Sequence, residues 1–248
     1  MLKKFRADLH IHTCLSPCAD LTMSPRRIID KAAALGLDII AICDHNSAEN
    51  AAAAVRAALK HNIKVLPGME ITTLEEAHIL ALFDETGPVL KLQEKIYAHL
   101  PPEENSQEAF GYRIIANEFD EVEGYSKKLL LSATELTLEE LVDEIHRLGG
   151  LAIASHIDRE AFSVIGNLGF IPAELELDAL EISVQISRDE ALDRYPGIEK
   201  YPLVTSSDAH YLEDIGRAHT SFLLETPDIS EIRKAFTNRE GRRLIREE

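Results

Sequence analysis

The 248-residue chain carries 26 Lys and Arg residues against 43 Asp and Glu residues, which gives a formal net charge of -17. Binding to a phosphate backbone depends on Lys and Arg, so this charge disfavours a nucleic-acid partner. The chain has no run of about 18 apolar residues, and its three cysteines, an odd number, make a poor disulfide framework. We therefore expect a folded, cytoplasmic chain with no membrane partner.

Short apolar strands alternate with helical stretches along the chain, a pattern typical of parallel β-α-β units. The first helix is expected to begin at Ser24 and Pro25 and to end at Gly36, because proline suits the first helical position and glycine ends helices. Thr137 and Glu140 have the spacing of a capping box before another helix. The expected strands are 5–12, 37–44, 63–70, 77–83, 150–156, 179–184 and 202–207.

The segment from about residue 87 to 135 interrupts this alternation, because turn-forming and acidic residues surround a short apolar piece. It is too long for a simple loop. We predict a mostly helical insertion or lid within a single domain that spans residues 1–248. A solvated excursion with no catalytic role fits the pattern equally well.

Histidines and acidic residues follow nearly every expected strand. Alternation along the first strand places Asp8, His10 and His12 on one face. In a parallel barrel the carboxyl ends of the strands converge on one mouth, so the later residues of this kind should join that face. Imidazole and carboxylate groups in such number suit two or three Zn, Mn or Fe ions. These later candidates are Asp44, His45, Glu70, His78, His156, Asp208 and His210.

An HxH pair alone is weak evidence for a metal, because two histidines on a strand are often ordinary polar or core residues. The whole series argues otherwise, since each candidate follows or begins an expected strand. An amidohydrolase barrel also begins with HxH, but it generally needs a lysine on the fourth strand and a lone late aspartate. The present chain has instead a DH pair, Glu70 and a terminal DAH.

The motifs DLHIHT, ICDHN, GMEIT followed by His78, ASH and SSDAH resemble those of the PHP (polymerase and histidinol phosphatase) family, from about residue 6 to residue 217. The resemblance implies a distorted (β/α)7, TIM-like barrel and a trinuclear metal centre that hydrolyses phosphoesters. Glu70, Asp208 and His210 would be catalytic, with Glu70 as a bridge between ions. By the same resemblance, His10, His12, Glu70 and Asp208 would hold one ion, Glu70, His78 and His156 a second, and His45 and His210 much of a third.

The chain departs from this family in its opening stretch. Members usually carry an Asp or His five or six residues after the second histidine of HxH, where this chain has Pro17 and Cys18. We predict that Asp20 completes the third site, because a hard oxygen ligand suits Mn or Fe as well as Zn. Cys18, as a thiolate, is the alternative zinc ligand.

Such a centre would explain how an acidic protein handles an anionic substrate. Closely spaced divalent ions activate a water molecule and neutralise phosphoryl oxygens, and they concentrate positive charge at the mouth. Arg159 and, as a weaker candidate, Arg217 are expected to bind a substrate phosphate. Asp8 and Asp44 are expected to orient imidazole groups.

Three functions compete at this stage. The first is a phosphomonoesterase that acts on a small phosphorylated metabolite, such as a nucleotide or histidinol phosphate. The second is a phosphodiesterase or exonuclease, which the net charge of -17 makes less favoured. The third is a non-enzymatic metal-binding module, which missing ligands would favour. Because only one of the expected ligand positions is altered, we predict a metal-dependent phosphoric ester hydrolase of the first kind.

Overall fold

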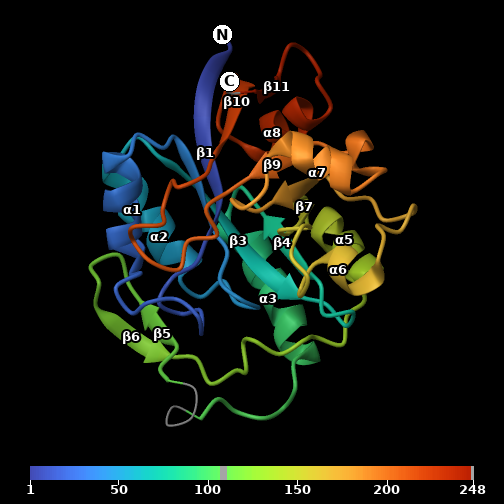
Figure 1. Ribbon diagram of the computed structural model, residues 1–248. Helices are drawn as coiled ribbons and strands as arrows, with labels where there is room; N and C mark the ends of the chain where they lie inside the picture. Colours follow the sequence, from blue (N-terminus) through green and yellow to red (C-terminus); the bar gives the residue numbers. More distant parts are fainter. Residues whose placement is uncertain (107–110, 247–248) are drawn as a thin grey trace.

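The computed structural model describes residues 1–106 and 111–246, and within these ranges one nine-stranded sheet organises the chain (Figure 1). The strand order is β11-β10-β1-β2-β3-β4-β7-β8-β9. The sheet is curled, and helices pack around it. Its strands are β1 (Lys3–Ile11), β2 (Ile39–Ile42), β3 (Lys64–Thr72), β4 (His78–Leu82), β7 (Leu151–Ala154), β8 (Ala179–Ile182), β9 (Leu203–Thr205), β10 (Thr220–Leu224) and β11 (Arg243–Ile245).

All seven strands expected from the sequence are present, mostly with shorter bounds. β2, with sequence IIAI, and β7, with sequence LAIA, are buried along their whole length, as continuous apolar runs predict. β10 and β11 were not expected from the sequence. They pair antiparallel at one end of the sheet, outside the alternation of strands and helices.

The direction of β4 differs from the expected parallel arrangement. β4 runs antiparallel to both β3 and β7, and its first residue, His78, pairs with Thr72 at the end of β3. The reason is the short connection, in which the Thr73 N–H donates to the Ala77 carbonyl at 2.9 Å. A parallel crossover needs a dozen or so residues. The start of β4 therefore lies at the same end of the sheet as the carboxyl ends of the parallel strands, and we call this end the mouth.

The sheet remains open between its edge strands, β9 and β11. At the mouth, however, the chain beyond β9 reaches β1 through a parallel bridge between Ile11 and Ala209. The His12 N–H donates to the Ala209 carbonyl at 3.0 Å, and the Ala209 N–H donates to the His10 carbonyl at 3.3 Å. The expected distorted α/β barrel is thus confirmed as a curled, mixed sheet that closes only at its mouth.

Helices pack against both faces of this sheet. α1 packs against α2 beside β1 and β2. Ser24 occupies the N-cap position of α1 as expected, although its side chain makes no capping hydrogen bond, and Gly36 follows the end of the helix at φ 68°. None of the described helices is both long and apolar enough to span a membrane. The helices are α1 (Pro25–Ala34), α2 (Ala51–Ala57), α3 (Thr86–His99), α5 (Leu138–Arg147), α6 (Val164–Leu168), α7 (Arg188–Arg194) and α8 (Ile229–Phe236), with short 3-10 turns η1 (Ala58–Lys60) and η2 (Ile198–Lys200).

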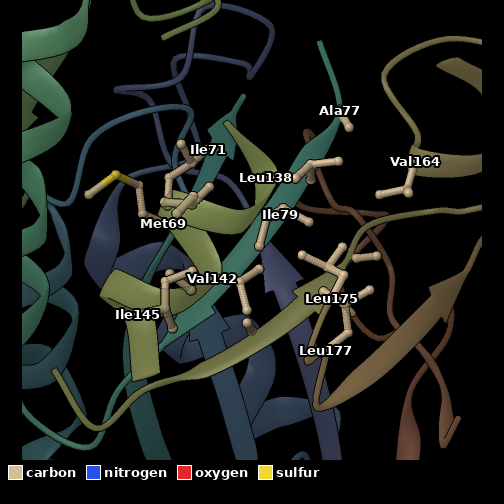
Figure 2. Close-up of a cluster of buried hydrophobic side chains, with 14 of the residues drawn as sticks. Met69, Ile71, Ala77, Ile79, Leu138, Val142, Ile145, Val164, Leu175 and Leu177 are labelled. Carbon is tan, nitrogen blue, oxygen red and sulfur yellow. The ribbon is translucent and has the colours of Figure 1, made fainter. Parts of the chain in front are cut away.

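One large apolar cluster lies between the β3–β4 hairpin and the helices that cover it (Figure 2). The capping box of Thr137 and Glu140 starts α5 as expected, and the apolar face of α5 then packs on Met69, Ile71 and Ile79. Each such buried side chain contributes about 1.5–3 kcal/mol relative to its exposed state. The α5 residues of this face are Leu138, Leu141, Val142 and Ile145.

The segment 87–135 is less helical than expected. Its first part belongs to α3, and its other regular part is a hairpin of β5 (Ile114–Ala116) and β6 (Val122–Tyr125), while residues 107–110 lie outside the described ranges. The hairpin is docked on the loop after β1, because the Ile114 N–H donates to the Cys14 carbonyl at 3.2 Å. The Asn50 side chain binds the carbonyl of Ile114 and the N–H of Ala116. The segment therefore contacts the mouth region directly.

We expect Gly68→Ala to lower the free energy of unfolding by about 1–3 kcal/mol. A Cβ atom at Gly68 would lie 2.8 Å from the Ala81 carbonyl oxygen and 3.1 Å from that of Ile42, which are backbone atoms of the neighbouring strands. The matched control is Gly87→Ala, where the added Cβ meets nothing within 4 Å. Urea unfolding measures both, and equal stability of the two variants would contradict this packing.

Candidate metal centre

The mouth gathers the histidines that the sequence places at separate strand ends. The His12 ring lies 4.3 Å from the His210 ring and 4.7 Å from the His45 ring, between centroids. The His78 ring lies 5.3 Å from that of His45 and 5.4 Å from that of His156. Strands β1, β3 and β4 carry His10, Glu70 and His78 themselves, whereas the others follow β1, β2, β7 and β9. The convergence expected from strand topology is therefore present.

Glu70 lies at the middle of this group and is only 1% exposed. Burial alone would raise the pKa of Glu70, but the imidazoles of His78, His10 and His45 hold it well below its usual range. Its two carboxylate oxygens face different histidines, which is the arrangement of a bridging ligand. Oε1 lies 2.9 Å from His78 Nδ1, 3.3 Å from His156 Nε2 and 3.4 Å from His10 Nε2, and Oε2 lies 3.1 Å from His45 Nδ1 and 3.4 Å from His12 Nε2.

Asp208 faces the same group from the chain after β9. Its Oδ1 lies 3.3 Å from His10 Nε2 and 3.2 Å from His12 Nε2. Asp208 has φ 50° and His156 has φ 28°, so both adopt the left-handed region that non-glycine residues rarely occupy. Such strain is retained where the surrounding structure imposes a particular side-chain direction.

The donor set fits divalent cations. Among the described residues, His156 Nδ1 is buried without a hydrogen-bond partner, which costs about 1–3 kcal/mol. His45 Nδ1 and Asp208 Oδ1 are also buried, and their nearest polar atoms belong to other candidate ligands. Burial, together with the nearby His210, lowers the pKa of His12 to about 4, so this imidazole is in the neutral form that binds metals. In each of three groups, all ligand atoms lie within 4.8 Å of one another: His12, Cys18, His45 and His210; His10, His12 and Asp208; and His45, Glu70 and His78.

Asp44 orients His12 through a serine, not directly as expected. The Ser16 hydroxyl donates to Asp44 Oδ1 at 2.6 Å, and its oxygen lies 2.9 Å from His12 Nδ1. Because the hydroxyl hydrogen is committed to Asp44, the serine oxygen accepts from Nδ1, and the unprotonated Nε2 faces the centre. The Asp8 carboxylate instead accepts from the N–H groups of Ser207 and Gly216. Burial raises the pKa of both aspartates to about 6.

Glu181 is a site residue that the sequence analysis missed. It lies on β8, is 2% exposed, and its Oε2 is 2.9 Å from His10 Nδ1 and accepts from the His156 N–H at 3.2 Å. Burial alone would lower the pKa of His10, but Glu181, Asp208 and Glu70 hold it well above its usual value. The available signal was a lone acidic residue inside the apolar run ALEI.

The structure separates the two candidates for the altered ligand position. Cys18 Sγ lies 2.9 Å from His210 Nε2 and belongs to the group with His12 and His45. Asp20 is not in any of the ligand groups of the described residues. Its Oδ1 instead accepts from the backbone N–H and the hydroxyl of Thr22, at 2.8 and 2.6 Å. The geometry therefore favours Cys18 over Asp20, the reverse of our preference from the sequence.

The two expected phosphate-binding arginines differ in position. Arg159 reaches the centre, where its Nη2 donates to Asp208 Oδ2 at 2.5 Å, and its side chain is 42% exposed. Arg217 pairs with Asp214 at 3.1 Å on the surface, and no contact among the described residues joins it to the centre. Only Arg159 is placed to meet a substrate at the mouth.

Comparison with known proteins decides the family. The model of the PHP domain matches residues 8–171, and the model of the PHP-associated region matches residues 199–240. The chain belongs to the PHP domain family. It is a metal-dependent phosphoesterase of that family, and its histidine and carboxylate clusters are consistent with metal binding.

Among curated PHP relatives, the 5'-3' exoribonuclease of Haemophilus influenzae is 37% identical over 92 residues, which are 36% of this chain and 32% of the exoribonuclease. Among solved structures, the lesion-specific endonuclease PfuEndoQ from Pyrococcus furiosus has a TM-score of 0.68 at 20% identity. A structure of Endonuclease Q with a 27-mer duplex that carries an abasic lesion has a TM-score of 0.67 at 18% identity. In both, the match covers 98% of this chain and 58% of the other, so it shows a shared PHP-type fold.

We expect Cys18→Ala to weaken binding of one metal ion by at least about tenfold, while Asp20→Ala leaves the metal content unchanged. The thiol faces His210, whereas the Asp20 carboxylate is held by its own turn. Metal analysis of both purified variants after dialysis measures the difference. Loss of an ion from the Asp20 variant alone would reverse the assignment.

We expect Glu181→Gln to lower metal affinity about 10- to 100-fold, because the charge that orients and polarises His10 is removed while the shape is kept. Titration of the metal-stripped protein measures this affinity. Glu176→Gln, an exposed substitution shortly before β8, serves as the control. Equal affinities in the two variants would show that Glu181 has no such role.

Proposed function

We propose that this protein hydrolyses phosphoester bonds in nucleic acid, as a metal-dependent nuclease or phosphodiesterase. The observation that carries the proposal is the position of Glu70, with its oxygens divided among five histidines at the mouth. Support for the substrate class comes from the relatives, since an exoribonuclease shares sequence with this chain and a DNA-bound endonuclease shares its fold.

In this proposal, two or three divalent ions, Zn, Mn or Fe, are held at the mouth. When bound, they supply an activated water and charge neutralisation for the phosphoryl group. Glu70, Asp208 and His210 are the proposed catalytic residues. The proposed ligands are His10, His12, Cys18, His45, Glu70, His78, His156, Asp208 and His210.

Arg159 orients the substrate in this proposal. Its guanidinium already contacts a carboxylate oxygen of Asp208, and its partial exposure leaves further N–H groups for phosphoryl oxygens. Arg159 would thus link the proposed metal ligands to a phosphate of the substrate.

A small phosphorylated metabolite is the second candidate substrate, and the net charge of -17 favours it. This was the first choice from the sequence, because an acidic protein attracts nucleic acid poorly. The relatives favour nucleic acid as the substrate instead, since the names of several of them describe enzymes that act on nucleic acid. The metal ions offset the charge locally, so the overall charge weakens binding without excluding it. A single domain and a cytoplasmic location remain predictions.

We expect the metal-loaded protein to release nucleotides from short single-stranded oligonucleotides, and His12→Ala and Asp208→Ala to lose activity at least about 100-fold. His61→Ala, a histidine that pairs with Asp30 at the far end of β3, should keep full activity. Analysis of the products from these oligonucleotides and from a panel of phosphomonoesters tests both candidate substrate classes.

Phosphate release from monoesters alone would replace the first candidate with the second. Wild-type rates in both site variants would overturn the centre itself.

A further inference from the structure

Phe162 presents a half-exposed aromatic ring beside the candidate metal centre. Its ring centroid lies 5.0 Å from that of His78, and the two planes are inclined by 24°, so the rings are stacked. His78 is one of the residues in contact with Glu70, yet Phe162 itself remains 47% exposed. An aromatic side chain of this size is usually buried. Here it stands at the edge of the site, with a large part of its surface open to solvent.

The backbone holds the ring in this position at a cost. Phe162 has φ 59°, a conformation that is an outlier for a bulky residue. Its carbonyl accepts a hydrogen bond from the His78 N–H at 3.0 Å, which ties the loop between β7 and α6 to the start of β4. Strain of this kind clusters at active sites and ligand clamps, so its occurrence beside the candidate metal centre motivates a ligand role for this position.

The same loop is fixed internally. The Ser163 hydroxyl donates to the Arg159 carbonyl at 2.6 Å, and the Arg159 N–H donates to the His156 carbonyl at 2.9 Å. A Cβ atom at Gly166 would lie 2.7 Å from the Arg159 carbonyl oxygen, so the first turn of α6 packs closely on the loop. The loop therefore presents its side chains in a preformed arrangement.

We propose that Phe162 is a stacking platform for a nucleobase of the substrate next to the phosphate under attack. The inference rests on the proposed function and specifies its substrate contact. One short loop then carries a candidate ligand in His156, a phosphate-binding group in Arg159 and an aromatic surface in Phe162. Stacking on an aromatic ring accepts any base, because every base has a π face. A phosphorylated sugar or polyol has no π face, so it should gain much less from Phe162 than a nucleotide does.

Direct binding tests the platform without any need for turnover. The chain contains no tryptophan, so Phe162→Trp creates a single fluorescent reporter at the mouth. We expect saturable quenching when a nucleoside 5'-monophosphate is added and none with ribose 5-phosphate. Leu59→Trp is the matched control, because Leu59 is 81% exposed on η1, just before β3 and at the end opposite the mouth. Its fluorescence should not respond to either compound.

Kinetics with matched oligonucleotides complete the test. We expect Phe162→Ala to raise KM about tenfold for an oligonucleotide with a terminal base, with little change in kcat. KM should be unchanged for the same oligonucleotide without that base, and Phe162→Trp should restore the wild-type value. A merely structural role would change both substrates equally.

Hydrolysis with equal KM in wild-type and Phe162→Ala protein, without quenching in Phe162→Trp, would overturn the platform and leave the proposed function intact. Quenching by the nucleotide in a protein that cleaves no oligonucleotide would support the platform and reject the proposed function.

Discussion

The burial of one carboxylate among imidazoles is the constraint around which the mouth is built. Glu70 is almost fully removed from solvent, and an isolated buried carboxylate would be costly. The surrounding histidines hold its pKa low, so it stays ionised. The imidazole nitrogens and carboxylate oxygens then lie close to one another, an arrangement that divalent cations would stabilise.

The supporting residues follow from the same constraint. A neutral imidazole binds a cation with one nitrogen only, so the other nitrogen must be satisfied from behind. Glu181 does this for His10, and Ser16, held by Asp44, does it for His12. The curled sheet provides the necessary positions because its strands arrive at the mouth from several directions. The curled sheet therefore places both the candidate ligands and the residues that orient them.

The sequence predicts this arrangement where local pattern decides it. Apolar runs locate β2 and β7. The ends of the expected strands locate the histidines, because the alternation of strands and helices indicates a barrel in which those ends converge. Contacts over long sequence distances are missed. Glu181 lies 171 positions from His10, and nothing near either residue indicates their pairing. For Asp20 the relevant signal was local, since an aspartate two residues before a threonine commonly caps its own turn, as Asp20 does with Thr22.

The pairing of β3 with β4 determines where His78 lies relative to Glu70. Thr72 pairs with His78 across a connection of residues 73–77, and Glu70 pairs with Leu80 in the same register. A shift of β4 by one residue in this register would turn its side chains to the opposite face, so that His78 would point away from Glu70. The ligand geometry at the mouth therefore depends on the alignment of two short strands as well as on the ligands themselves.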